Sequence, residues 1–267
     1  MIAIIFFIIG ACIGSFLNVA IYRIRHNISV LTPPSFCPEC KTPLKFYHNL
    51  PIIGYIILKG KCSFCKKKIS ARYIIVEFLS AVFAPLYLLK FGFTPDFVFF
   101  FLFTSLLIIT SFIDAQTGII PDAITVPFIL IGFALSFFSQ QTKPLSSFLG
   151  IIAGTAPLIL SALVYKGITK KDGMGGGDIK FLAMIGAFTG FKGAIFTVIT
   201  SSFIGSVAGG IILVFIRKKK LKPEHIKRVT YKNSISFPFA PFLSAGAVIY
   251  IFFGQTLIDW YLNLFKL

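Results

Sequence analysis

The chain has 267 residues, of which 56% are hydrophobic and only 13% are charged; its mean hydropathy is +0.88 and its formal net charge is +17. A soluble domain of this length cannot bury so much apolar surface, so the composition excludes an ordinary soluble protein. The charge is concentrated in two basic segments, 23–72 and 217–234, which is typical of cytoplasmic loops that contact anionic lipid headgroups.

Apolar runs of about 20 residues recur along the whole chain. Their hydrophobicity is continuous rather than alternating, which favours spanning helices over a barrel. We therefore expect an all-α polytopic membrane protein with about eight transmembrane helices and a small cytoplasmic zinc-binding subdomain between the first two. The expected apolar segments are 1–22, 73–89, 97–113, 123–138, 145–165, 179–191, 194–216 and 235–258.

The distribution of basic residues predicts the topology. The first apolar run has no basic residues before it and several after it, which indicates an uncleaved first span with its N-terminus outside. The chain would then consist of a first helix at 1–22, a cytoplasmic subdomain at 23–72 and a seven-helix membrane domain at 73–267. The loops expected in the cytoplasm are 23–72, 114–122, 166–178 and 217–234, and those expected outside are 90–96, 139–144 and 189–193. We expect membrane lipid as a partner and no nucleic acid, which would need aromatic side chains interleaved with the charge.

Two C-x-x-C pairs lie in the first basic segment, "CPEC" at 37–40 and "CSFC" at 62–65. Cytosolic reductants disfavour disulfides, and four thiolates from two such turns suit tetrahedral Zn²⁺ with no open position. We therefore predict a structural zinc ion on Cys37, Cys40, Cys62 and Cys65, rather than redox use of either pair. The metal would stabilise a subdomain whose own core is small.

Four acidic residues lie at the cytoplasmic ends of apolar helices: Glu77, Asp114, Asp122 and Asp178. Ionisable groups in such places are costly unless they face water or a partner, so they are candidates for function. A helix cap explains Asp122, which follows a proline. A cap alone does not explain Asp178, because "GMGGG" before it removes side-chain bulk and lets the backbone approach another chain closely.

Two carboxylates held close together share one proton at working pH. The ionised member can take a proton from water while the protonated member polarises a peptide carbonyl, which is aspartyl peptide hydrolysis. Asp114 and Asp178 are placed on the same side of the membrane by the charge distribution. No Ser–His–Asp arrangement is visible, because His26, His48 and His225 lie in the basic segments, away from any nucleophile motif.

These residues resemble those of the type IV prepilin leader peptidases. The resemblance rests on "DAQTGIIPD" at 114–122 and "GMGGGDIKFLAMIGAFTG" at 173–190, and on motifs in the same order elsewhere in the chain. The other motifs are "GSFLNVAIYR" at 14–23, the two cysteine pairs, "NLPIIGYIILKGKCSFC" at 49–65 and "ISARYIIVE" at 69–77.

The resemblance implies an intramembrane GxGD aspartyl endopeptidase of the bacterial cytoplasmic (inner) membrane, with Asp114 and Asp178 catalytic and facing the cytoplasm. Its substrates would be type IV prepilins or pseudopilins, cleaved after a glycine that ends a short basic leader. The resemblance also implies methylation of the new N-terminus with S-adenosylmethionine. Residues expected to bind substrate or to support the loops are Gly175, Gly176, Gly177, Lys180, Asp122 and Glu77.

Two alternatives remain open from the residues. In a multi-span ion or small-solute transporter, Asp114 and Asp178 would be coordinating carboxylates. In a membrane-bound methyltransferase, the peptidase site would be degenerate. No G-x-G-x-x-G strand–turn–helix motif for S-adenosylmethionine is present.

Overall fold

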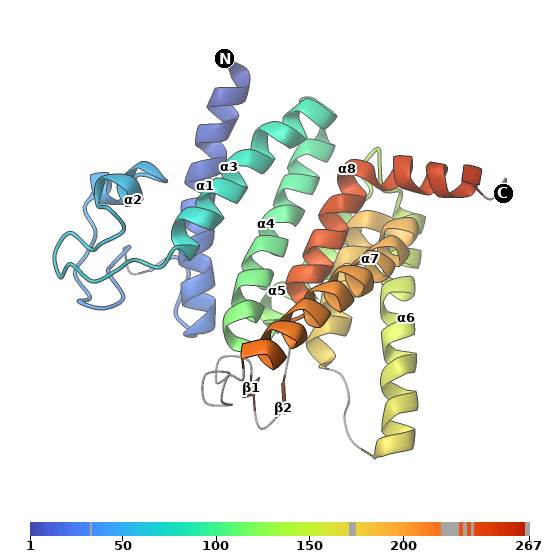
Figure 1. Ribbon diagram of the computed structural model, residues 1–267. Helices are drawn as coiled ribbons and strands as arrows, with labels where there is room; N and C mark the ends of the chain where they lie inside the picture. The colour runs from blue at the N-terminus through green and yellow to red at the C-terminus, as the bar shows by residue number, and fades with distance from the viewer. Residues whose placement is uncertain (33, 171–174, 220–229, 232–233, 236–237, 265–267) are drawn as a thin grey trace. The chain divides into compact units, whose positions relative to one another are not determined.

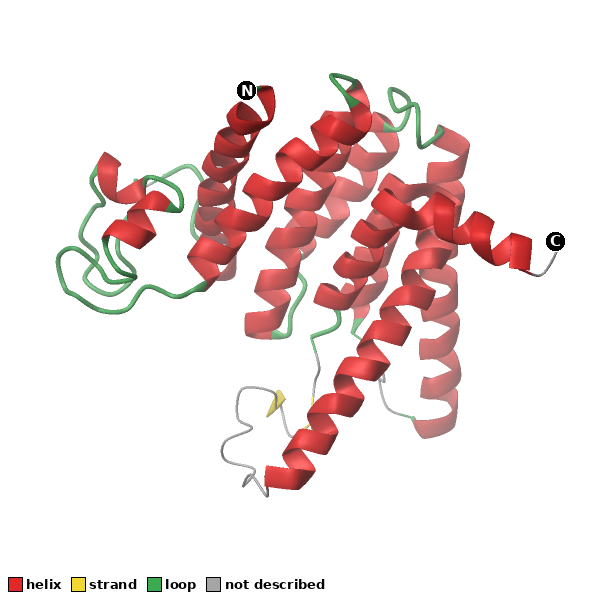
Figure 2. Ribbon diagram, turned by 45° about the horizontal axis from the view of Figure 1, so that its top comes forward, coloured by secondary structure: helices red, strands yellow, loops and turns green. Residues whose placement is uncertain are grey.

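The computed structural model describes residues 1–32, 34–170, 175–219, 230–231, 234–235 and 238–264. Helices dominate this part of the chain, with two strands of two residues each (Figure 2). The expected all-helical, polytopic architecture is confirmed. The chain divides into two compact units, Met1–Ile109 and Thr110–Leu267, and helix α4 (Pro95–Thr117) crosses the boundary.

In the first unit, α1 (Ile2–Arg25) packs side by side with α3 (Arg72–Phe91) (Figure 1). The segment between them contains the 3-10 turn η1 (Phe46–Asn49) and the short helix α2 (Ile53–Ile57). The side-chain amide of Asn18, which is buried in α1, donates a 2.9 Å hydrogen bond to the carbonyl of Tyr73 at the start of α3. The start of α3 is therefore joined to α1 by a polar contact, which lipid could not replace.

The second unit contains α5 (Asp122–Leu135), α6 (Pro144–Thr169), α7 (Gly176–Lys219) and α8 (Ala240–Leu264). Strands β1 (Thr230–Tyr231) and β2 (Ser234–Ile235) form an antiparallel pair before α8. The first half of α7 is apolar on all sides and packs against α5, α6 and α8, so it forms the core of this unit. Its fully buried side chains include Phe181, Leu182, Met184, Ile185 and Phe188.

Helix α7 joins two segments that the sequence analysis treats as separate spans, 179–191 and 194–216. Gly190 interrupts it with φ 72° and ψ −174°, a conformation that L-residues with side chains rarely adopt. The Ser146 hydroxyl lies against this break and accepts a 3.3 Å hydrogen bond from the N–H of Phe191. The two halves are therefore distinct helices that meet at a glycine without an intervening loop.

Six helices of the described part are long and apolar enough to cross a membrane: α1, α3, α4, α6, α7 and α8. Helix α5 has 14 residues, which at 1.5 Å per residue makes it about 21 Å long, shorter than the ~30 Å hydrocarbon core. With α5 and the two halves of α7 counted separately, the structure contains all eight expected apolar segments. Of the basic segment 217–234, residues 220–229 and 232–233 lie outside the described part.

Candidate active site

Asp114 lies one turn before the end of α4, and its carboxylate is buried at 5% exposure. The helix ends because Gly118 takes φ 66°, and the Gly118 N–H closes the last turn with a 2.7 Å hydrogen bond to the Asp114 carbonyl. Oδ2 of Asp114 accepts a 3.0 Å hydrogen bond from the backbone N–H of Ala240, the first residue of α8. This bond uses an N–H that has no partner within its own helix, and it orients the carboxylate.

Asp178 is the third residue of α7 and is half-buried. Its backbone N–H donates a 3.2 Å hydrogen bond to the Gly175 carbonyl, which closes the turn that starts the helix. The first two residues of "GMGGG", Gly173 and Met174, lie outside the described part, and the other three are Gly175, Gly176 and Gly177. These three glycines leave little side-chain bulk around the Asp178 carboxylate at the start of α7.

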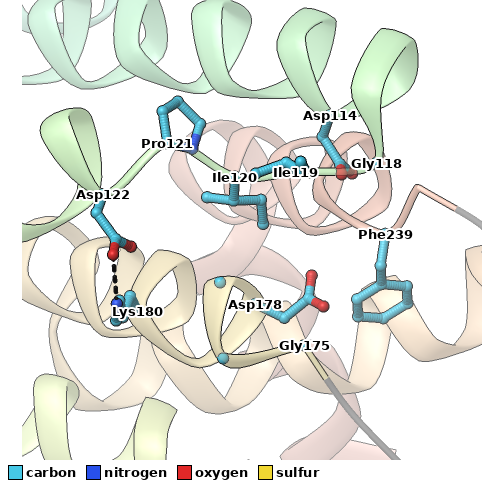
Figure 3. A pocket seen from close by; sticks show the side chains of 12 residues that line it. Asp114, Gly118, Ile119, Ile120, Pro121, Asp122, Gly175, Asp178, Lys180 and Phe239 are labelled. Carbon is cyan, nitrogen blue, oxygen red and sulfur yellow. Dashed lines mark hydrogen bonds and ion pairs between the residues drawn. The ribbon is translucent and has the colours of Figure 1, made fainter.

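The two carboxylates line one pocket, which has a volume of about 480 Å³. Figure 3 shows that they point into it from opposite sides, and they interact electrostatically. The pocket is an open cleft between the 118–121 turn after α4, the glycine segment before α7 and Phe239 before α8. The lining residues are Asp114, Gly118, Ile119, Ile120, Pro121, Asp122, Gly175, Gly176, Gly177, Asp178, Lys180 and Phe239.

Asp122 does not cap α5, so that expectation is wrong. The N-cap residue is Pro121, no side chain caps the helix, and Asp122 is the first residue of the helix itself. Its carboxylate instead accepts a 2.7 Å hydrogen bond from the ammonium group of Lys180 at the rim of the pocket (Figure 3). The cation is within reach because the starts of α5 and α7 lie side by side, and an ion pair replaces the cap.

Glu77 belongs to the first unit and is not among the residues that line the pocket. It lies in α3, is 7% exposed, and accepts a 2.8 Å hydrogen bond from the backbone N–H of Ile52. A hydrogen bond with Ser15 of α1 adds a second partner. Its carboxylate therefore joins α1, α3 and the start of α2.

Ile120, Phe239 and the Ala240 N–H also belong to this site, although they were not expected there. Ile120 packs beneath Gly177, where an added Cβ would lie 3.0 Å from the Ile120 Cβ. Pro238 and Pro241 surround the start of α8 and could have indicated a helix N-terminus there. Nothing in the sequence indicates that this N-terminus meets Asp114, which is 126 residues away.

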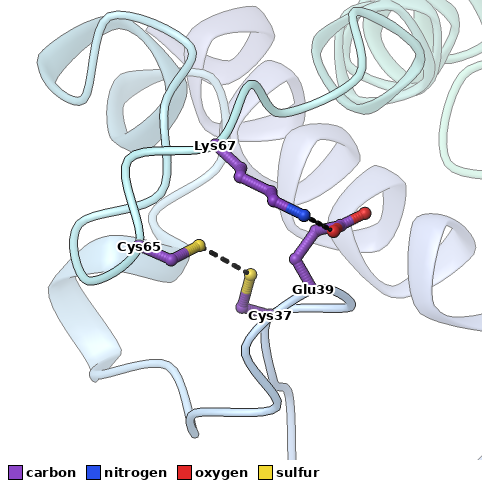
Figure 4. Close-up of polar contacts among 4 residues, drawn as sticks. All are labelled: Cys37, Glu39, Cys65 and Lys67. Carbon is purple, nitrogen blue, oxygen red and sulfur yellow. Dashed lines mark hydrogen bonds and ion pairs between the residues drawn. The ribbon is translucent and has the colours of Figure 1, made fainter.

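The four predicted zinc ligands come together in the first unit. The sulfur atoms of Cys37, Cys40, Cys62 and Cys65 all lie within 4.8 Å of one another, and the Cys37 and Cys65 sulfurs are 4.0 Å apart (Figure 4). Tetrahedral zinc with Zn–S bonds of about 2.3 Å places its sulfurs about 3.8 Å apart, so the cluster fits this ion. All five cysteines of the chain are free.

Both cysteine turns have the same backbone pattern, which the sequence analysis did not anticipate. In the first, Cys37 N–H binds the Thr42 carbonyl and Lys41 N–H binds the Cys37 carbonyl; in the second, Cys62 N–H binds the Lys67 carbonyl and Lys66 N–H binds the Cys62 carbonyl. Lys41 and Lys66 both have a positive φ, 58° and 59°. Each turn therefore presents its two thiols to the cluster in the same way.

Without a bound cation, the pKa values of Cys40 and Cys65 shift in opposite directions. Hydrogen bonds from the side chain and backbone of Thr42 lower the pKa of Cys40 to about 6. A backbone hydrogen bond from Lys67 acts in the same direction on Cys65, but burial and hydrogen bonds to the other three thiols raise its pKa to about 11. A divalent cation is the partner that makes four adjacent thiolates compatible.

An ion pair between Glu39 and Lys67 joins the two cysteine turns at the surface (Figure 4). The Lys67 ammonium lowers the pKa of the Glu39 carboxyl through this hydrogen bond and its charge. Because both side chains are more than half exposed, the pair adds little stability.

Comparison with known proteins gives a consistent result along the chain. The profile of the bacterial peptidase A24 N-terminal domain matches residues 8–91, and that of the type IV leader peptidase family matches residues 101–210. A prepilin leader peptidase/N-methyltransferase of Neisseria gonorrhoeae is 34% identical over 78% of this chain and 81% of its own length. Proteins with that name from Aeromonas salmonicida and Pseudomonas aeruginosa are 30% and 28% identical, and each alignment covers 96% of this chain and 92% of the relative. No solved structure matches the chain significantly.

Proposed function

Since the chain belongs to the type IV leader peptidase family, and is therefore a multi-pass membrane protease, we propose that it removes the basic leader of type IV prepilin-like proteins. The expected cut follows a glycine and precedes an apolar helix. The observation that supports this most directly is the pocket in which Asp114 and Asp178 point toward each other from two helix ends. The transporter alternative is not favoured by the family relationship.

Hydrolysis by the pair would proceed through water held between the two carboxyl groups. One carboxylate takes a proton from the water, whose oxygen bonds to the scissile carbonyl carbon, while the protonated partner donates to the carbonyl oxygen. Transfer of a proton to the amide nitrogen then breaks the C–N bond and releases an amine and a carboxylic acid. The hydrogen bond from the Ala240 N–H would hold Asp114 in place during these transfers. Because this bond engages Oδ2, the transfers would use the other oxygen of the carboxylate.

The glycine segment would let an extended substrate reach Asp178. Gly176 has open space beside it, and the only atom near an added Cβ on Gly175 is Oδ2 of Asp178, at 3.6 Å. Backbone groups that are free of side chains can pair with a substrate strand while its scissile bond lies between the carboxylates.

The cytoplasmic side is the proposed location of this chemistry. Four helix ends meet around the pocket: the end of α4 and the starts of α5, α7 and α8. A basic leader is retained in the cytoplasm while the apolar helix of the same substrate enters lipid, so the bond between them lies at the cytoplasmic membrane surface. We propose the bacterial inner membrane as the location, because the matching N-terminal domain and the relatives named above are bacterial.

N-methylation with S-adenosylmethionine is proposed from the printed names of the relatives alone. Among its described lining residues, the pocket has Phe239 as its one aromatic ring, and Lys180 is paired with Asp122. These described lining residues thus include no separate cation for the carboxylate of this cofactor, and they do not fit it. No methyl-transfer step is assigned to them.

The test of the proposed function is cleavage by the purified protein of a peptide built as basic leader, glycine, phenylalanine and apolar helix. Mass spectrometry should find a single cut after the glycine. Cleavage elsewhere, or none in a folded preparation, would overturn the assignment. With S-adenosylmethionine present, methylation predicts that the apolar product gains the mass of one methyl group.

A further inference from the structure

The short helix α2 exposes a row of isoleucines. Ile53, Ile56 and Ile57 are 56%, 61% and 69% exposed. Their spacing of three and four residues places them on one face of the helix. Tyr47 of the adjacent turn η1 is also 56% exposed. These four side chains, here named the α2 patch, are apolar although the surrounding segment is rich in lysine.

The start of α2 is attached at a depth well inside the two neighbouring spanning helices. The N–H of Ile52 binds Glu77, which is five residues after the first residue of α3 and so about 7.5 Å along that helix. Glu77 also binds Ser15, which is ten residues, or about 15 Å, before the end of α1. Figures 1 and 2 accordingly show α2 beside α1 rather than beyond its end.

The backbone is strained to place α2 there. Ile52 has φ 61° and ψ −53°, which is a rare conformation for a β-branched residue and costs free energy. The Glu77 carboxylate holds the Ile52 N–H, and Gly54 allows α2 to approach η1, since an added Cβ there would lie 2.6 Å from the His48 carbonyl oxygen. The position of α2 is therefore maintained by specific contacts.

Charged residues flank the α2 patch in the way expected of a helix that lies in a membrane interface. Lys45 and Lys59, on either side in the sequence, are exposed, and the Lys45 ammonium lies 5.9 Å from the centre of the Tyr47 ring. Isoleucine, tyrosine and lysine are the side chains that a helix in an anionic bilayer surface places among the acyl chains, at the boundary and toward water, respectively. If this site faced water, Ile53, Ile56 and Ile57 would expose apolar surface to it at a free-energy cost.

From this arrangement we propose that the α2 patch inserts into the boundary between headgroups and acyl chains of an anionic bilayer, beside α1 and the start of α3. Glu77 is the positioning residue that holds α2 at that depth. The cysteine subdomain is thereby attached to the membrane by a third contact in addition to the two spanning helices.

The test places tryptophan in the patch and measures its surroundings. In a Trp260→Phe background, which removes the native tryptophan, Ile56→Trp is reconstituted in vesicles of phosphatidylglycerol and phosphatidylethanolamine. We expect quenching by lipids brominated near the glycerol end of the acyl chain, and loss of quenching by aqueous iodide. Ile57→Trp is the second variant, in case the first does not fold. Lys68→Trp, in the exposed second cysteine turn, is the matched control and should be quenched by iodide.

Two outcomes would overturn the proposal. One is iodide quenching at position 56 equal to that at position 68. The other is shielding of position 56 that appears only when a prepilin is added, which would make the patch a docking site for substrate. The positioning role of Glu77 is tested by two further variants. Glu77→Gln keeps an oxygen that can accept the hydrogen bond from the Ile52 N–H, so it should preserve quenching by lipid. Glu77→Leu removes that acceptor and should expose the tryptophan to iodide. Unchanged quenching in Glu77→Leu would remove that role.

Discussion

The backbone N–H of Ala240 donates a 3.0 Å hydrogen bond to Oδ2 of Asp114. The start of α8 thereby meets the end of α4, and one turn further into each helix the hydroxyl groups of Ser111 and Ser244 are 2.6 Å apart. The two contacts together set the position of the buried carboxylate relative to the pocket. Because the N–H engages one oxygen only, the other remains available for proton transfer.

Replacement of either pocket aspartate by asparagine should abolish detectable cleavage. An amide has nearly the shape of a carboxylate but cannot act as a base, and loss of such a group costs about 10²–10⁴-fold in rate. Asp114→Asn and Asp178→Asn should fold normally, as judged by thermal unfolding in detergent, and fail in the peptide assay.

The matched control for these variants is Asp122→Asn at the rim of the same pocket. It weakens an ion pair with Lys180 in which both side chains are more than 40% exposed, so little stability should be lost and most activity retained. Substantial cleavage by either pocket variant, or equal loss in all three, would mean that the pair is misassigned.

The serine contact between α4 and α8 should be measurable by a double-mutant cycle. Ser111→Ala and Ser244→Ala each remove one hydroxyl of a partly buried pair, and each should lower the free energy of unfolding by about 1 kcal/mol. If the hydroxyls stabilise each other, the double variant should lose less than the sum of the single losses. Fully additive losses would show that the contact contributes nothing.

The glycines before α7 should differ in their tolerance of a side chain. Gly177→Val should greatly reduce cleavage, because even a Cβ at this position lies 3.0 Å from the Cβ of Ile120 in the pocket wall. Gly176→Ala is the matched control for folding, since nothing lies within 4 Å of its added Cβ, and it should leave thermal unfolding unchanged. Gly175→Val should also impair cleavage if substrate backbone passes beside Asp178. A fully active Gly177→Val protein would show that the glycines serve only as a turn.

Elemental analysis of the purified protein should find about one zinc ion per chain. Cys62→Ser removes one of four clustered thiols and should release the metal and destabilise the 23–72 segment more than it reduces peptide-bond hydrolysis. Cys12→Ser is the control, because Cys12 is exposed in α1 and outside the cluster, and it should retain the metal. An active preparation without zinc, or with disulfides among these cysteines, would contradict the metal site.

Positions 143 and 170 should lie on opposite sides of the membrane. They flank α6, a 26-residue helix about 39 Å long, which is sufficient to span the hydrocarbon core. In a Cys12→Ser background, Lys143→Cys should react with an impermeant thiol reagent from outside, and Lys170→Cys only after permeabilisation. Peptide mapping separates these labels from the zinc ligands. Labelling of both from one side would refute the proposed topology.

Apolar runs long enough to span a bilayer, paired cysteines and aspartates at helix ends are local patterns. For that reason all eight apolar segments, the four clustered thiols and the two pocket carboxylates could be predicted from the sequence. Their physical basis is short-range: a helix satisfies its own backbone in lipid, and a C-x-x-C turn presents two thiols by itself.

Contacts between distant segments were decided only by the tertiary structure. The Ala240 N–H on Asp114, the pairing of Asp122 with Lys180 in place of a cap, and the bond from Ile52 to Glu77 each join residues that no periodicity relates. The same holds for α7, where Gly190 lets two apolar segments meet directly instead of through a loop. Such contacts depend on which helix ends are neighbours in space, and packing between helices determines that.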